Sequence, residues 1–283
     1  MTVRTLVAGV ATPLPNDPVL ESAVRLAERT GADLHLVHAL APDTPDERRG
    51  EVETAIEERV AALTARGGVF CRAVPGTPER VLAAAADEAG AHLLVLAPTR
   101  RGALAGRLLG TTAQNVLRQA RVPVLVLHGS LPPEPRVLLT TDLSAHSLPA
   151  HARGVRLAGV LGAAGGLRTL HVAPPAHADV PRVRTADEDV ARGMAELREF
   201  LAAEPLDPAP EPRVRTGEPA TEIVREAAEW GADVLVLGTH GRTGAARWLL
   251  GSVAETVLRG APCSVLVVPP APVSAAAQDG GAR

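Results

Sequence analysis

An internal repeat spans nearly the whole chain and limits the folds that the chain can adopt. Residues 110–118 (GTTAQNVLR) recur at 251–259 (GSVAETVLR), 141 positions later. Further matches follow in the same order: 76–78 with 217–219, 91–96 with 232–237, and, at a spacing of 133, His38 with His171. A chain of 283 residues with one such repeat predicts two domains of the same fold.

Each copy alternates short aliphatic runs with longer helical patterns. The runs lack the apolar–polar alternation of a half-exposed strand, which is typical of parallel strands covered on both faces. The predicted strands are 5–9, 33–38, 69–74, 92–96 and 124–127 in the first copy, and 136–141, 167–172, 213–216, 233–237 and 264–268 in the second. The order β-α-β-α-β-α-β-α-β predicts an α/β fold with a five-stranded, doubly wound parallel sheet in each copy.

The helix ends carry recognisable signals. Asp17, Thr77 and Glu218 each precede a proline, a pattern that predicts a helix N-cap followed by proline at the first helical position. Glycines that suit a left-handed residue after a helix are Gly31, Gly90 and Gly231. The apolar stripe within 51–65 predicts a further helix that packs on the sheet.

These elements define the predicted domain limits. The first domain covers residues 1–128, a Pro-rich linker covers 129–135, and the second domain covers 136–270. Residues 271–283 are rich in Ala, Pro and Gly, and we expect them to be disordered.

Composition excludes several classes of function. All 29 basic residues are arginine, so a Walker-type phosphate loop and Schiff-base chemistry through lysine are excluded. A net charge of −3 and 1% aromatic residues argue against nucleic-acid binding. No signal peptide or membrane-length apolar stretch is visible, so we expect a cytoplasmic protein without membrane contact. The spacing motifs of metal sites and hydrolases are missing, and we assign no catalytic or metal-binding residue.

One group of residues in the second copy has the spacing of an anion-binding site. Gly238 and Gly241 are separated by two residues, and nine more residues precede Gly251-Ser252. Glycines allow a backbone to approach a ligand closely and to adopt positive φ, and successive amides in such a loop bind anions. A helix that starts at Ser252 adds free N–H groups and its dipole. The spacing therefore predicts a phosphate site that needs no lysine.

Asp142 follows the first strand of the second copy, and two interpretations of it stay open. In a doubly wound sheet ligands bind where the winding reverses, so the Asp142 carboxylate could accept a hydrogen bond from a ribose hydroxyl or an adenine amino group. The alternative is an Asx-turn or a helix N-cap.

The first copy departs from this pattern. By the repeat, Val10 corresponds to Asp142, Ala97 to Gly238 and Arg100 to Gly241, whereas Gly110-Thr111 keeps its place. The carboxylate is lost and side chains replace glycines. The first copy therefore carries a degenerate site, an altered anion site that uses an arginine, or an arginine lent to the second copy.

This group of residues in the second copy, together with the closing run 261–268, resembles the universal stress protein family, and the resemblance covers both copies. It implies a nucleotide-binding α/β domain in each half, and edge strands 124–127 and 264–268 that pair the halves as a pseudo-dimer within one chain. It also implies ATP as ligand, with Mg²⁺ left open. The positions that it assigns to the nucleotide are Asp142, Val172, Gly238, Gly241, Gly251, Ser252 and Val253.

The function that the resemblance implies is a regulatory or protective factor in the stress response, controlled by ATP and acting on an unidentified protein partner. Two alternatives stay open: a slow ATP hydrolase and a scaffold without ligand. Association of two chains as a homodimer is also left open.

Overall fold

The computed structural model describes residues 2–10, 17–61, 68–97, 111–174, 185–239 and 250–270. Strands and helices alternate through these residues as the repeat predicts. The strands are β1 (Thr5–Gly9), β2 (Asp33–Leu40), β3 (Val69–Pro75), β4 (Leu93–Leu96), β5 (Val124–Val126), β6 (Arg136–Thr141), β7 (Gly166–Ala173), β8 (Glu211–Thr216), β9 (Val234–Gly238) and β10 (Ser264–Val268). The helices are α1 (Pro18–Thr30), α2 (Asp46–Ala61), α3 (Pro78–Glu88), α4 (Thr111–Gln119), α5 (Ser147–Leu161), α6 (Ala186–Ala203), α7 (Pro219–Trp230) and α8 (Ser252–Gly260).

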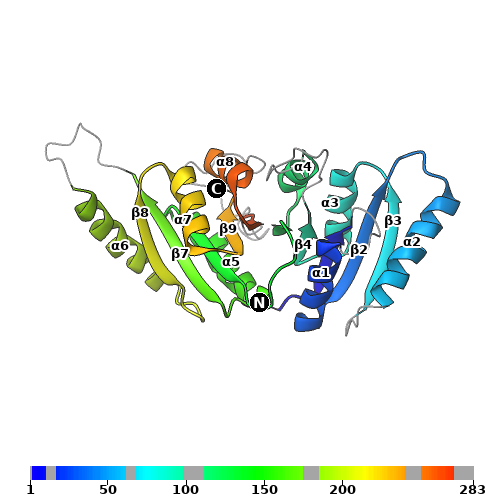
Figure 1. The fold of residues 1–283 in the computed structure, drawn as a ribbon, viewed down its shortest axis with the longest axis horizontal. Helices are drawn as coiled ribbons and strands as arrows, with labels where there is room; N and C mark the ends of the chain where they lie inside the picture. The colour runs from blue at the N-terminus through cyan, green and yellow to red at the C-terminus, as the bar shows by residue number, and fades with distance from the viewer. Residues whose placement is uncertain are drawn as a thin grey trace, which may run out of the picture.

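All ten strands form one sheet in the order β3-β2-β1-β4-β5-β10-β9-β6-β7-β8. Within each half the strands are parallel, and the two halves meet where β5 and β10 pair antiparallel. Figure 1 shows α4 and α8 next to each other at the centre of the molecule, with α2 and α6 at opposite ends. The predicted fold is confirmed: two five-stranded parallel sheets are joined as a pseudo-dimer.

The seam between the halves is almost symmetric. Leu125 lies opposite Leu266, and the flanking pairs are Val124 with Val267 and Val126 with Val265. Every residue of both strands is buried. Pairing β5 with β10 removes two unpaired sheet edges that would otherwise expose backbone donors and acceptors.

The helices cover both faces of the sheet. Helices α1, α2 and α5 pack over one apolar core, and α3, α4, α7 and α8 pack over a second core on the other face. A smaller cluster joins α6 to β7 and β8 through Leu197, Phe200, Ala173 and Val214. Because aromatic residues are scarce, Leu, Val and Ala supply nearly all of the buried apolar surface.

Most of the predicted helix ends are confirmed, and two are corrected. The carboxylates of Asp17 and Glu218 accept hydrogen bonds from the first-turn amides of α1 and α7. Thr77 stands before α3 but makes no side-chain capping bond. Helix α2 begins at Asp46, ahead of the apolar stripe that starts at Val52.

The linker between the halves is held by α1. Arg25 donates to the Leu131 carbonyl at 2.9 Å, and Arg29 donates to the Pro133 carbonyl at 2.7 Å. The Leu131 amide donates to the Ser22 hydroxyl at 3.3 Å. These bonds fix the path by which the chain passes from one half to the other.

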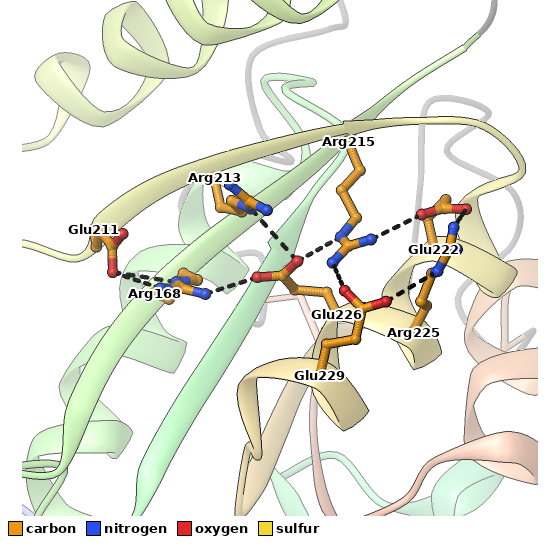
Figure 2. A network of polar contacts seen from close by, with 8 residues as sticks. All are labelled: Arg168, Glu211, Arg213, Arg215, Glu222, Arg225, Glu226 and Glu229. Carbon is orange, nitrogen blue, oxygen red and sulfur yellow. Dashed lines mark hydrogen bonds and ion pairs between the residues drawn. The ribbon is translucent and has the colours of Figure 1, made fainter.

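A network of arginine and glutamate distinguishes the second half from the first (Figure 2). At its centre the buried Glu226 accepts from Arg168 at 2.7 Å and from Arg215, with Arg213 at 3.5 Å. Burial raises the pKa of Glu226, but the hydrogen bonds from Arg215 and Arg168 outweigh it and leave that pKa below its usual value.

The described part of the first half keeps only one ion pair of this network, between Arg72 and Glu88 at 3.2 Å, the counterparts of Arg213 and Glu229. By the repeat, Val74 stands for Arg215 and Ala85 for Glu226. These smaller side chains line a groove of about 400 Å³, together with the charged side chains of Arg72, Arg80 and Glu88. The same backbone framework therefore supports a buried charged network in one half and an open groove with a single ion pair in the other.

A buried histidine predicts a pH-dependent stability. His151 Nε2 lies 2.9 Å from Thr169 Oγ1, and burial lowers the pKa of His151 from 6.5 to about 4. Between these values the unfolded chain binds the proton and the folded chain does not, so stability should fall as pH falls from about 6.5 to 4, by about 3 kcal/mol. Urea denaturation at a series of pH values measures this slope.

The first half supplies the matched control, because Leu20 and Leu36 occupy the positions of His151 and Thr169. The double variant H151L/T169L should lose the slope between pH 6.5 and 4. An unchanged slope in that variant would assign the pH dependence to other groups.

Candidate functional site

Three of the predicted site positions lie at the carboxyl edge of the second-half strands or directly beside it. Asp142 follows β6, Gly238 ends β9, and Val172 is the penultimate residue of β7. Strand β6 lies between β7 and β9, and the chain reverses its winding between β6 and β9. Ligands of doubly wound sheets bind at this kind of switch point.

The start of α8 is fastened to the end of β9. The Gly251 amide donates to the Thr239 carbonyl at 3.1 Å, and the Thr239 amide donates to the Val268 carbonyl at 3.3 Å. Gly251 is the N-cap of α8 and provides no side-chain capping bond. The amides in the first turn of a helix have no partner within the helix, so they are the donors that this edge offers to an anion.

The predicted backbone conformation of Gly238 needs correction. Gly238 lies in extended backbone as the last residue of β9, where it pairs with Val268, and is not part of a turn with positive φ. Gly251 has φ of −61°, which any residue can adopt, and its own amide is already bonded. Gly241 lies outside the described residues. Positive φ is therefore found at neither Gly238 nor Gly251, and the anion site itself stays a prediction.

The loop after β6 has the Asx-turn that the sequence left open for Asp142. One carboxylate oxygen, Oδ1, accepts from the Ser144 amide at 3.0 Å and from the Ser144 hydroxyl at 2.7 Å. Leu143 between them has φ of 62°. The Ser147 hydroxyl, 3.0 Å from that of Thr141, ties this turn to α5. The carboxylate of Asp142 is thus held rigidly at the edge of the sheet.

The two valines among the predicted positions differ in exposure. Val172 is nearly buried in the core on the α7 side, whereas the Val253 side chain is 37% exposed on the first turn of α8. Ser252, beside it, is also exposed. An exposed apolar side chain next to free helix amides suits a ligand with both a charged and an apolar part.

The sequence of the first half lacks the carboxylate, and the strand register corrects one match. Leu6 and Val137 lie against the equivalent residues Leu93 and Val234, so β1 and β6 are related by a spacing of 131. Val10 therefore corresponds to Thr141, and Ala11, outside the described residues, corresponds to Asp142. The carboxylate is still missing from the first half. Arg100, the predicted counterpart of Gly241, also lies outside the described residues.

The paired histidines have a structural role. His38 Nδ1 lies 2.8 Å from the Val10 carbonyl, and His171 Nδ1 lies 3.1 Å from the Thr141 carbonyl. Each ring thus fastens its strand to the end of the neighbouring strand at the same place in each half. The interpretation of this recurrence as packing rather than catalysis agrees with these contacts.

Sequence reasoning missed a contact between the halves next to the site. Arg118 on α4 donates to the Glu255 carboxylate on the first turn of α8 at 2.8 Å. The repeat shows Arg118 and Arg259 as equivalent residues, but it gives no sign that one of them crosses the seam. Only the antiparallel pairing of β5 and β10 brings α4 and α8 together.

None of the described helices has both the length and the apolar character needed to cross a membrane. No group of three or more His, Cys, Asp or Glu side chains in the described ranges is placed to hold a metal ion.

Comparison with known proteins assigns the family. A model of the universal stress protein family matches the chain twice, over residues 2–128 and 135–269. The chain belongs to the universal stress protein family. Its two matches make it a tandem member, with one family domain on each side of the linker.

Two curated universal stress proteins from Mycobacterium tuberculosis H37Rv are similar to this chain. Rv2005c is 32% identical over 244 residues, which cover 78% of this chain and 77% of that protein. Rv2623 is 29% identical over 291 aligned positions, which cover 92% and 95% of the two chains. The similarity thus extends over both domains.

Solved structures share the tandem fold. A functionally unknown protein from Pseudomonas aeruginosa PAO1 superimposes with a TM-score of 0.74 at 22% identity, covering 95% of this chain and 93% of the other. A universal stress protein from Archaeoglobus fulgidus gives a TM-score of 0.67 at 19% identity, covering 93% and 98%. At this level of identity the likeness concerns the fold.

Proposed function

We propose that the second half of this universal stress protein binds an adenine nucleotide, with ATP as the first candidate. The observation that carries the proposal is the start of α8, where no side chain caps the helix and Ser252 and Val253 are exposed beside the end of β9. The helix amides and dipole would hold the phosphates without a lysine.

The remaining residues at the carboxyl edge of the second-half sheet can bind the nucleoside. Asp142 stands at the end of the neighbouring strand with its carboxylate held by Ser144, and a carboxylate accepts hydrogen bonds from ribose or from an amino group. Val253 offers an apolar contact to the base or the sugar. The family pattern of Gly238, Gly241 and Gly251-Ser252 supports the same assignment.

The proposed role of binding is regulation in the stress response. A ligand that binds only the folded state stabilises it, and a ligand that prefers one conformation shifts the population toward it. Nucleotide binding would then determine which protein partner the chain binds. Both domains share one sheet, so a change in the second half has a direct route to the first.

Titration of the purified full chain with ATP, followed by calorimetry, tests the proposal. We expect one ATP per chain, because the first half lacks the matching carboxylate and has Ala97 and Arg100 in place of Gly238 and Gly241. Mass spectrometry of gently unfolded protein provides a second measurement, and co-purified nucleotide is the expected result. A chain that binds no ATP and carries no nucleotide is a scaffold, and the proposal would then be abandoned.

Slow hydrolysis of ATP is the competing activity, and the geometry supports it less. A hydrolase needs a base that activates water near the γ-phosphate. The Asp142 carboxylate is bonded to the turn that follows β6 and would be used at the nucleoside end. Steady phosphate release that disappears on substitution of Ser252 would favour hydrolysis.

The proposed location is the cytoplasm. Cys71 and Cys263 are both free, as expected in a reducing compartment. Burial raises the pKa of Cys71 to about 11 and that of Cys263 to about 12, so neither thiol ionises readily. Cys71 is only half-buried on β3, less than the sequence predicted.

A further inference from the structure

The contact between α4 and α8 places a charge of the first half next to the nucleotide site of the second. Arg118 Nη2 lies 2.8 Å from Glu255 Oε1, and the two residues belong to different domains. Arg259 on α8 also reaches the Glu255 carboxylate, at 3.5 Å. Glu255 is the one acidic residue in the first turn of α8.

Glu255 and Ser252 lie on the same face of α8, three residues apart. Residues three apart on a helix are neighbours, so the Glu255 side chain starts about one turn, roughly 5 Å, from that of Ser252. An unpaired carboxylate at this distance repels a triphosphate bound at the helix start. Pairing with arginine weakens this repulsion, because the positive charge offsets the carboxylate. Arg118 at 2.8 Å is the nearer partner of Glu255, and Arg259 at 3.5 Å is the more distant one.

We propose that Arg118 of the first half is a positioning residue for the nucleotide site of the second half: it neutralises Glu255 and so allows a polyphosphate to bind at the start of α8. The inference rests on the proposed function and gives the first half a defined part in it. In this arrangement Arg118 of the first half contacts the Glu255 carboxylate and does not contact the phosphate itself.

The test is calorimetric titration of the full chain with ATP, inorganic tripolyphosphate and adenosine. We expect Arg118→Gln to weaken ATP and tripolyphosphate binding about tenfold and to leave adenosine binding unchanged, because only the phosphates feel the released charge. Arg118→Lys should bind ATP with an affinity near that of the wild type, since it keeps the charge.

The double variant R118Q/E255Q should return to within about twofold of the wild type, because the charge that Arg118 compensates is gone. Arg72→Gln is the matched control: it also removes an arginine paired with a glutamate, Glu88, at 3.2 Å in the first half but far from α8 in the sheet order. We expect R72Q to match the wild type.

The outcomes separate this inference from the proposed function. ATP binding in the wild type with R118Q equal to R72Q overturns the inference and leaves the nucleotide site standing. A double variant as weak as R118Q also overturns it, since Arg118 would then act without Glu255. Absence of ATP binding in the wild type removes both proposals.

Discussion

A glutamate in place of Ser252 is expected to abolish ATP binding while the protein stays folded. Ser252 is exposed at the first position of α8, so its replacement disturbs no packed side chain. A negative charge there is favourable to the helix dipole, by about 0.3–1 kcal/mol. The same charge stands where the phosphates would bind, and a loss of affinity of about 100-fold or more should follow.

Thr111→Glu is the matched control, because Thr111 begins α4 at the equivalent place in the first half. It adds the same charge to the same kind of helix end. Calorimetry should show normal ATP binding to T111E and none to S252E, with equal melting temperatures. Equal ATP affinity in both variants would place the nucleotide elsewhere in the chain.

The second large effect is expected for Glu226→Ala, which should lower the free energy of unfolding by about 3–5 kcal/mol. The Glu226 side chain is 2% exposed and is surrounded by Arg168, Arg213 and Arg215 (Figure 2). Its removal leaves arginine charges that are partly buried without their central partner. Urea denaturation followed by circular dichroism measures the loss.

Glu229→Ala provides the comparison, because Glu229 pairs with Arg215 in the same network but is exposed to solvent. We expect a much smaller loss for E229A. The triple variant R168H/R215V/E226A copies the first half and should regain part of the stability, since apolar groups can replace a buried ion pair at little cost. If E226A and E229A unfold at the same urea concentration, the network does not depend on its buried member.

Most of the fold was predictable because its signals are local. Aliphatic runs gave all ten strands within two residues, and the repeat linked them into two equal sheets. The start of α2 was not predictable, since residues 46–50 are polar and show no apolar period. Thr77 has the sequence of an N-cap but no capping bond, because its side-chain orientation is not encoded in the motif.

The site was less accessible from the sequence because hydrogen bonds between segments determine its donors. The bond from Gly251 to Thr239 removes one amide that the motif seemed to offer. The match of Val10 to Asp142 was wrong by one residue, since the copies are 131 apart at β1 and 133 apart at β2. A single repeat spacing applied to both strands therefore misaligns residues at the end of β1 by one position.

The two domains whose strands β5 and β10 pair belong to one chain, and this changes which substitutions evolution can select in each domain. A dimer of identical chains must present the same surface twice, so every substitution appears on both sides of its axis. Here each domain always meets the other at fixed stoichiometry and high effective concentration. Arg118 can therefore pair with Glu255 while its repeat counterpart Arg259 stays on its own helix, and the two halves are free to specialise.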